Sequence, residues 1–262
     1  MMPVLDKPTI QYVVEEAVEA GLEDILIITG RGKQSIERHF DKSYELKTEL
    51  KAAGKEARLD RVKDISDLVD IHYIRQKNRS GLGDAVQYAQ KHVGNEPFAL
   101  LLGDTIIKND RPCTAYLIKY AEQYEESTIS LERVPWEDIP SYGVADVVDT
   151  DENQPSFLVS GFVEKPAQED APSNIAITGR YVLTSDIFGY LNEIEPGVGG
   201  ELQLTDAIRK LSSVRGVVLK GDRYDIGNIP QWLQANIQMA LKHDSGEMNR
   251  AVEELLRSEL HE

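Results

Sequence analysis

The chain has 262 residues, of which 41% are hydrophobic and 28% are charged, and its formal net charge is −16 at pH 7. This composition is typical of a globular protein with a substantial core, and the acidic balance argues against a nucleic-acid partner, which needs a basic surface. No apolar run reaches the length of a membrane span, no secretory signal precedes Pro8, and the single cysteine, Cys113, excludes an internal disulfide framework. We therefore expect a cytoplasmic protein that has no membrane partner.

Helical and strand patterns alternate through the first half of the sequence. Strand patterns occupy 24–30, 70–76, 97–104 and 127–134, and helical patterns occupy 8–20, the segment ending near Phe40, the segment after Gly83, and 114–124. The charged stretch 41–70 shows no strand signal, so we expect surface helices there. This alternation indicates an α/β fold with a doubly wound, Rossmann-like mixed sheet that is mostly parallel.

The second half of the sequence is richer in strands. Strand patterns at 142–148, 155–166 and 173–183 are separated by turns, which favours partly antiparallel pairing. Helical patterns follow near 185–193, 203–213, 230–242 and 247–258. Because no linker or repeat interrupts the chain, we expect a single domain over 1–262, with parts at about 1–135, 136–229 and 230–262.

The segment RQKNRSGLGDA (75–85) is a candidate binding loop. Gly81 and Gly83 open a helix just beyond a strand, where a planar ligand can approach backbone N–H groups, and the Gln76 amide can read the edge of a base. The alternative is an ordinary flexible connection.

Two aspartates are candidate metal ligands. Asp104 follows the apolar strand ALLLG, at the carboxyl end where open α/β sheets bind ligands, and Asp225 lies in the glycine-containing turn RYDIGN. Carboxylates at such positions are natural Mg²⁺ ligands. The alternative for each is a turn or a helix cap.

The segment FVEKP (162–166) ends a strand with an acid and a base. Side chains alternate along an ideal strand, so Glu164 and Lys165 point to opposite faces and a plain ion pair between them is not expected. A glutamate suits sugar hydroxyls and a lysine suits a phosphate. The alternative is an ordinary charged surface.

A series of ordered segments resembles the bacterial and archaeal UTP–glucose-1-phosphate uridylyltransferases, within the sugar-phosphate nucleotidyltransferase family. These segments are LDKPTIQYVVEEAVEAG, SIERHFDKSYELK, RQ…GLGDA, LLGDTII, YGVADV, FVEKP, APSNIAITGRYVL, GGELQLTDAI and YDIGN. The last two long segments, APSNIAITGRYVL and GGELQLTDAI, favour the uridylyl enzymes over the related thymidylyl enzymes. The resemblance implies that the first part of the domain binds the nucleotide and the second part binds the sugar.

On the nucleotide side, the resemblance implies that Gln76 and Gly81 contact uracil. It also implies that Asp104 and Asp225 hold Mg²⁺ at the phosphates, with Asp104 close to the nucleotide. Both aspartates then count among the catalytic residues.

On the sugar side, the resemblance implies that Gly143, Glu164 and Gly179 line the glucose site. Lys165 would meet the sugar phosphate as the third catalytic residue, and Glu201 would belong to the wall of the sugar site. The implied partners are UTP and glucose 1-phosphate, the implied product is UDP-glucose, and the implied assembly is a homo-oligomer.

The sequence departs from the family pattern at its start. The family begins with a central strand and a glycine-rich loop of the form GxGTRxxPxTxxxPKxM, on the order of 20 residues, ahead of the segment that matches MMPVLDKP. We expect a start assigned too late, with the chain as given nearly inactive or poorly soluble, because it lacks a central strand and the phosphate loop that supplies an arginine and a lysine. A stop codon just upstream of Met1, with no such coding sequence, would contradict this expectation.

Two other functions stay open on the sequence alone. One is a non-catalytic homologue, or a truncated inactive form, that binds a sugar nucleotide without turning it over. The other is the same enzyme class with dTTP in place of UTP.

Overall fold

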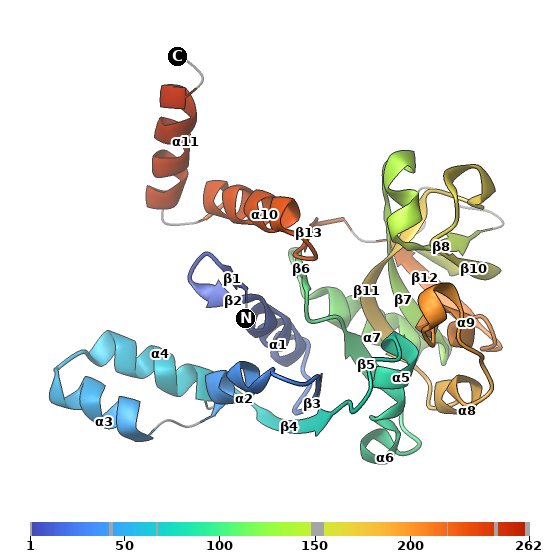
Figure 1. Ribbon diagram of the computed structural model, residues 1–262, viewed down its shortest axis with the longest axis horizontal. Coiled ribbons are helices and arrows are strands. Elements are labelled where there is room, and N and C mark those ends of the chain that lie inside the picture. The colour runs from blue at the N-terminus through green and yellow to red at the C-terminus, as the bar shows by residue number, and fades with distance from the viewer. Residues whose placement is uncertain are drawn as a thin grey trace.

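Figure 1 shows the computed structural model of the chain, which describes residues 2–41, 44–66, 68–147, 155–218, 220–243 and 246–259. Helices and a two-stranded sheet from the N-terminal part lie on one side, and a curled, strand-rich sheet lies on the other. The arrangement confirms the mixed α/β class that the alternating sequence pattern predicts.

The N-terminal part is built around helix α1, whose apolar face buries Val13, Val14 and Ala17. Strands β3 and β4 pair in parallel from Asp24 opposite Asp70 to Thr29 opposite Arg75. The charged stretch forms helices, as expected. The elements of this part are β1 (Pro3–Val4), β2 (Lys7–Pro8), α1 (Thr9–Glu19), β3 (Asp24–Thr29), α2 (Gln34–Phe40), α3 (Tyr44–Ala52), α4 (Glu56–Ser66) and β4 (Asp70–Arg75).

The strand-rich part contains a seven-stranded sheet with the order β10-β8-β11-β7-β12-β9, and β5 pairs with β11 beside this path. Its strands are β5 (Phe98–Leu101), β7 (Ser127–Arg133), β8 (Gly143–Asp146), β9 (Ser156–Leu158), β10 (Gly161–Glu164), β11 (Ile175–Leu183) and β12 (Val214–Val218). A separate pair joins β6 (Thr105–Lys108) to β13 (Asp222–Asp225). The central strand β11 is buried along its whole length.

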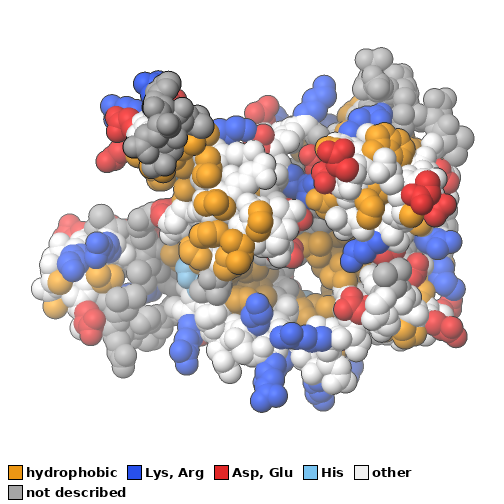
Figure 2. All heavy atoms as spheres, turned by 45° about the horizontal axis from the view of Figure 1, so that its top comes forward, with side chains coloured by type: hydrophobic (Ala, Val, Ile, Leu, Met, Phe, Trp, Pro, Cys, Tyr) orange, Lys and Arg blue, Asp and Glu red, His pale blue; other side chains and the backbone are white. Residues whose placement is uncertain are grey.

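Helices connect these strands or follow them in the sequence. They are α5 (Leu82–Gln87), α6 (Gln90–Val93), α7 (Cys113–Tyr124), α8 (Ile187–Leu191), α9 (Leu204–Ile208), α10 (Ile229–Leu241) and α11 (Glu247–Glu259), with 3-10 turns η1 (Trp136–Ser141), η2 (Gln168–Asp170) and η3 (Val198–Gly200). The last helix, α11, packs on α10 and extends away from the sheet in Figure 1. No helix in the described ranges is both long and apolar enough to cross a membrane. Hydrophobic side chains gather on the outer face over α10 in Figure 2, where Ile229 and Leu233 are exposed.

The expected predominance of parallel pairing is not observed between the described strands. Only β3–β4 and β7–β12 pair in parallel there, and the other strand pairs are antiparallel. The cause is β11, which lies between β5 and β7 and runs antiparallel to both. Strands β5, β7 and β12 therefore share one direction, as a doubly wound sheet requires, without β5 and β7 being neighbours.

The single strand expected over 155–166 is two strands. β9 pairs with β12 and β10 pairs with β8, so they lie at opposite ends of the strand order although only Val159 and Ser160 separate them. The backbone N–H of Val159 bonds to Val214 and that of Ser160 bonds to Asp146, at 2.9 Å each. The chain changes pairing partner within this step, and the sheet curls as a result.

An apolar groove of about 280 Å³ separates the β3–β4 pair from β5. Its walls include Leu26 and Ile28 from β3 and Leu100 from β5. In the described ranges β3 pairs only with β4, and β5 pairs only with β11. The sheet is therefore interrupted at this groove, and Figure 2 shows the molecule hollowed between the two parts.

The largest core lies between the sheet and helices α5, α8 and α9, and it supplies a test of the fold. Leu131 on β7 is fully buried, whereas Leu158 on β9 is 56% exposed. Leu131→Ala is expected to lower the free energy of unfolding by about 2–5 kcal/mol, because it leaves a cavity and loses buried apolar surface. The matched control Leu158→Ala should change it by less than about 0.5 kcal/mol. Equal losses in urea unfolding would contradict this core.

Candidate active site

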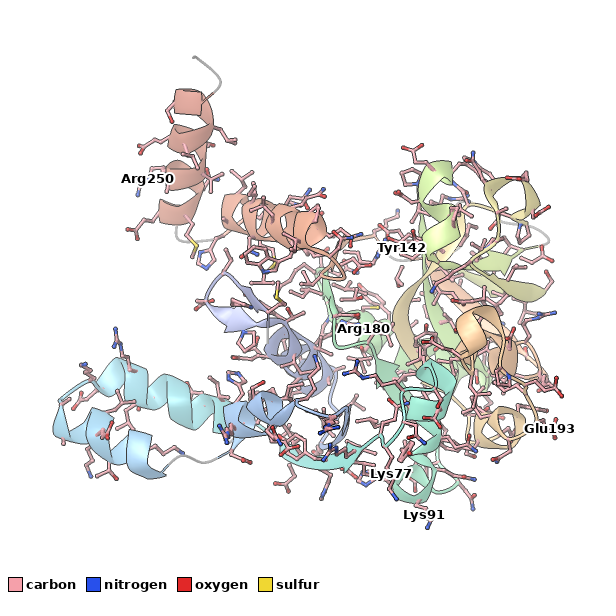
Figure 3. All side chains as sticks on the ribbon, viewed as in Figure 1. Lys77, Lys91, Tyr142, Arg180, Glu193 and Arg250 are labelled. Atoms are coloured by element: carbon pink, nitrogen blue, oxygen red, sulfur yellow. The ribbon has the colours of Figure 1, made fainter. Side chains whose placement is uncertain are left out.

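A pocket of about 310 Å³ opens between the strand-rich sheet and the β6–β13 pair. Its lining comes from segments far apart in the sequence and includes Leu82, Asp104, Tyr142, Gly143, Glu164, Lys165, Gly179, Tyr181, Thr205, Arg223 and Asp225. Figure 3 shows Tyr142 and Arg180 on the side of the sheet that faces α10 and α1. The pocket thus gathers both predicted metal ligands and most of the predicted sugar site.

Asp104 and Asp225 are placed by neighbouring backbone. Strand β6 begins at Thr105, which lies opposite Asp225 on β13, and the N–H of Ile226 bonds to the carbonyl of Asp104 at 2.9 Å. Desolvation and then the charge on Asp225 raise the pKa of Asp104 above its ordinary value. Two carboxylates that repel one another across a pocket are the arrangement that a bound cation relieves.

The Asp225 carboxylate is also fixed on its own turn. Its Oδ1 accepts a hydrogen bond from the N–H of Gly227 at 2.9 Å, and its Oδ2 lies 3.7 Å from Arg223. The residues present therefore fit a divalent cation such as Mg²⁺, which takes one or two carboxylates and keeps the other positions for water and phosphate oxygens. No group of three or more metal-binding side chains occurs in the described ranges.

Glu164 lies at the end of β10 and is held by a neighbouring hydroxyl. Thr205 on α9 donates a hydrogen bond to Oε2 of Glu164 at 2.6 Å. Gly143 is the register partner of Glu164, and a Cβ at this glycine would come within 3.0 Å of the same carboxylate oxygen. The sequence therefore leaves space for the carboxylate and orients it into the pocket.

Lys165 lines the same pocket as Glu164, although an ideal strand would point the two side chains apart. The reason is the backbone of Lys165, which has a φ of 46° and leaves the strand with a left-handed turn. Its N–H bonds to the carbonyl of Tyr142 at 3.0 Å. No hydrogen bond or ion pair engages its ammonium within the described ranges, so this exposed cation is available to an anion.

Arg223 is a second cation on the pocket wall, and the sequence motifs did not single it out. Its Nε donates to Glu132 and its Nη2 donates to the hydroxyl of Tyr142 at 3.2 Å. Burial lowers the pKa of Arg223, but these hydrogen bonds outweigh that effect and raise it. The spacing RYD carried a usable signal, because residues two apart on a strand share a face, and Asp225 was already a candidate.

Gly179 lets the central strand approach the Asp104 loop. Its φ is 86°, and a Cβ there would come within 3.0 Å of the Leu102 side chain. The register between β11 and β7 shifts between Ile177 and Tyr181, around this glycine. The side chain of Tyr181 is buried next to it, and burial raises the pKa of its hydroxyl.

Gln76, Gly81 and Glu201 do not line the pocket themselves. The Gln76 amide donates to Asp84 at 2.6 Å, and a Cβ at Gly81 would come within 2.8 Å of the Cβ of Glu201. The two segments are tied together, since the N–H of Leu202 bonds to Ser80 and that of Gly83 bonds to Leu202, at 2.8 Å each. Their link to the pocket is Leu82, which follows Gly81 and is part of the lining.

The Thr205–Glu164 hydrogen bond can be tested on its own. Thr205→Val keeps the shape of the side chain and removes the donor, which we expect to weaken glucose 1-phosphate or UDP-glucose binding by about 3- to 10-fold, the usual worth of one such bond. Isothermal titration measures the change. The matched control Thr184→Val removes a hydroxyl that pairs with Ser127, outside the pocket lining, and should leave affinity unchanged. Equal affinities of wild type and Thr205→Val would contradict a binding role for Glu164 as Thr205 orients it.

Comparisons with known proteins identify the family of the chain. Residues 1–241 match the family model described as nucleotidyl transferase. The chain is 47% identical to UTP–glucose-1-phosphate uridylyltransferase of Bacillus subtilis over 245 residues, which are 92% of this chain and 83% of that protein. The corresponding Staphylococcus epidermidis protein is 46% identical, covering 92% of this chain and 84% of that one.

Solved structures show the same similarity. A UDP-glucose pyrophosphorylase complexed with UDP-glucose superposes with a TM-score of 0.83 at 39% identity, over 93% of this chain and 90% of that chain. A UTP-bound UGPase from Acinetobacter baumannii superposes with a TM-score of 0.87 at 34% identity, over 98% of this chain and 90% of that chain. The chain therefore belongs to the nucleotidyl transferase family, in the branch of the UTP–glucose-1-phosphate uridylyltransferases.

Proposed function

We propose that this protein forms UDP-glucose and pyrophosphate from UTP and glucose 1-phosphate. The observation that carries the proposal is the single pocket that brings Asp104 and Asp225 together with Glu164 and Lys165. The relatives' names, and the ligands named for the solved structures, support the choice of substrates. The uridylyl relatives, at 45–47% identity, favour UTP over dTTP, since the thymidylyltransferase structure among the comparisons is 25% identical.

The reaction is an in-line displacement. A phosphate oxygen of glucose 1-phosphate forms a bond to the α-phosphorus of UTP, the bond from that phosphorus to the bridging oxygen of the β-phosphate breaks, and pyrophosphate leaves with the electron pair. The attacking oxygen is already ionised, so no general base and no covalent intermediate are needed. The protein has to align two anions that repel each other and stabilise charge in the transition state.

Four side chains divide this work between the sugar and the phosphates. Glu164, oriented by Thr205, accepts hydrogen bonds from glucose hydroxyls, and Gly143 and Gly179 give the sugar room. Lys165 meets the phosphate of glucose 1-phosphate. Asp104 and Asp225 are the residues that would hold Mg²⁺, which would supply positive charge to offset the negative charge of the phosphates.

The uracil end is proposed to lie beyond Leu82, at the loop that carries Gln76 and Gly81. The position is supported by Leu82, which follows Gly81 directly and is part of the pocket lining. Glu201 then borders the junction between the base side and the sugar side.

The proposal is tested by pyrophosphate release with UTP and glucose 1-phosphate, together with UDP-glucose binding. Both are measured on this chain and on a form extended at its N-terminus with a glycine-rich segment of the family type. Turnover that needs both substrates, and UTP preferred over dTTP, is the expected result for the extended form. UDP-glucose binding without turnover in a folded extended form would instead establish the non-catalytic homologue.

We also propose that the protein works in the cytoplasm as a homo-oligomer. The lone cysteine, Cys113, is buried and unpaired, which suits a reducing compartment. Exposed leucines on the C-terminal helices, Leu233 on α10 and Leu255 and Leu256 on α11, are apolar surface that a second copy can cover. Light scattering of the purified protein decides between a monomer and an oligomer.

A further inference from the structure

We infer that Arg180 is a positioning residue for the metal site: its buried ion pair with Glu16 clamps the backbone on both sides of Asp104 and so fixes that carboxylate for the cation. The inference rests on the proposed function. Neither residue is in the pocket lining, so neither contacts a ligand there, and they reach the site through the loop that they hold and through the positive charge of Arg180, which lowers the pKa of Asp104. Figure 3 shows Arg180 at the centre of the molecule, between β11 and the helices.

The guanidinium uses all of its donors inside the protein. The Arg180 side chain is 0% exposed, and its Nε and Nη2 donate to Oε2 of Glu16 at 3.0 and 2.8 Å. Nη2 also donates to the carbonyl of Thr105 at 2.8 Å, and Nη1 donates to the carbonyls of Leu102 and Gly179 at 3.3 and 3.1 Å. A guanidinium has five N–H groups in a rigid fork, and each has an acceptor here.

Two of these acceptors flank Asp104 directly. Leu102 lies two residues before it and Thr105 lies one residue after it, so a single planar group holds both ends of the 102–105 turn. The Leu102 N–H is also bonded to the carbonyl of Gly179 at 3.0 Å. The turn is therefore fixed to β11 from both directions, and the Asp104 backbone has little freedom to move.

Glu16 is fixed in its turn by a third element. Its Oε1 accepts hydrogen bonds from the N–H and hydroxyl of Thr114 at 3.2 and 2.8 Å, at the start of α7. Glu16 is 7% exposed, so both charges of the pair are out of water. A buried ion pair is weak evidence of net stability, because desolvation offsets the attraction, but a fully satisfied network specifies one geometry.

The variant Arg180→Lys distinguishes a positioning role, which affects the affinity for divalent cation, from a purely structural role, which affects only stability. Arg180→Lys keeps the positive charge beside Glu16, but one ammonium cannot reach Glu16 and the carbonyls on both sides of Asp104 together. We expect the affinity for divalent cation to fall about 10-fold or more, as it does when groups that orient a metal ligand are removed. The KM for glucose 1-phosphate should change less, by about 3-fold at most, because this network reaches the sugar side only at the Gly179 carbonyl, and no hydrogen bond in the described ranges joins it to Lys165 or Glu164.

The test measures Mn²⁺ binding in the presence of UDP-glucose, by the spin signal of free Mn²⁺, on the full chain as wild type, Arg180→Lys and Arg215→Lys. The control Arg215→Lys makes the same change at Arg215 on β12, which pairs with Glu126 just before β7, outside the pocket lining. The expected result is weaker Mn²⁺ binding for Arg180→Lys only. If wild type and Arg180→Lys bind Mn²⁺ with equal affinity, the inference is overturned. A lower melting temperature of Arg180→Lys would then reflect a structural role alone.

If circular dichroism shows that Arg180→Lys is unfolded, the same measurement is made on Thr114→Val, which removes one neutral hydrogen-bond donor from Glu16. We then expect about a 3-fold loss of Mn²⁺ affinity. Unchanged Mn²⁺ affinity in Thr114→Val would overturn the inference. Turnover by the extended form separates the two proposals. If the wild-type extended form is active and Arg180→Lys shows the same Mg²⁺ dependence, only the positioning role is overturned. If the wild type binds Mn²⁺ but forms no product, only the proposed function is overturned.

Discussion

Asp104→Asn is expected to lower kcat for pyrophosphate release by about 10³-fold in the extended form, the largest single loss in the pocket. Asparagine has nearly the same shape but no charge, so it cannot offset a cation or repel Asp225 across the site. The same substitution should weaken Mn²⁺ binding while UDP-glucose binding through Glu164 and Lys165 persists. Stopped assays of pyrophosphate at saturating UTP and glucose 1-phosphate measure the change.

The matched control for that experiment is Asp186→Asn. Asp186 is exposed at the start of α8 and is not in the pocket lining, so its variant should keep wild-type turnover. Asp104→Asn with activity within a few-fold of wild type would show that the metal assignment is wrong. Full activity of Asp225→Asn would show that Asp225 is not a metal ligand.

Lys165→Gln is expected to raise the KM for glucose 1-phosphate by about 10- to 100-fold, since a hydrogen bond to a charged group contributes about 1.5–3 kcal/mol. The KM for UTP should change much less, because Lys165 lies on the sugar side of the pocket beside Glu164. The left-handed backbone of Lys165 is unaffected by a change at the end of its side chain. Initial rates at varied glucose 1-phosphate give the result.

A surface lysine provides the comparison for this variant. Lys210→Gln removes a 44% exposed cation that pairs with Glu193 away from the pocket, and should leave both KM values at wild type. A Lys165→Gln enzyme whose KM for UTP rises as much as that for glucose 1-phosphate would place Lys165 on the nucleotide phosphates instead.

Much of the site follows from the sequence because its motifs end strands. Asp104, Glu164 and Asp225 each come at or just after a strand terminus, and all three line the pocket, although their strands belong to two different sheets. The predicted sugar-side residues Gly143 and Gly179 share the pocket with them, although their individual roles stay predictions. Gln76 was predicted from its place beside the Gly81–Gly83 turn and Glu201 on the resemblance alone, and the described pocket includes neither residue.

The residues that sequence reasoning missed act through long-range contacts. Arg180 lies in a strand that reads as apolar, and its partner Glu16 is on an amphipathic helix 164 positions away. Thr205 meets Glu164 across 41 positions. A single sequence records which residues a helix or strand contains, but which side chains meet depends on the packing of those elements.

Strand pairing was the least predictable part of the fold. The alternating pattern identified β3, β4, β5 and β7, yet the long strand β11 inserts between β5 and β7 from the second half of the chain. Within 155–166, the break between β9 and β10 falls at Val159 and Ser160, and the local sequence gives no stronger indication of it. Local patterns give strands, whereas their order depends on which edges are buried together.

Formation of UDP-glucose at the described pocket is tested most directly by the stoichiometry of the products. They are measured with the extended form, UTP, glucose 1-phosphate and Mg²⁺. We expect one pyrophosphate for each UDP-glucose, and a rate about 10³-fold lower when Asp104 is replaced by asparagine. A folded protein that binds UDP-glucose in the described pocket, but releases no pyrophosphate from the two substrates, would contradict it.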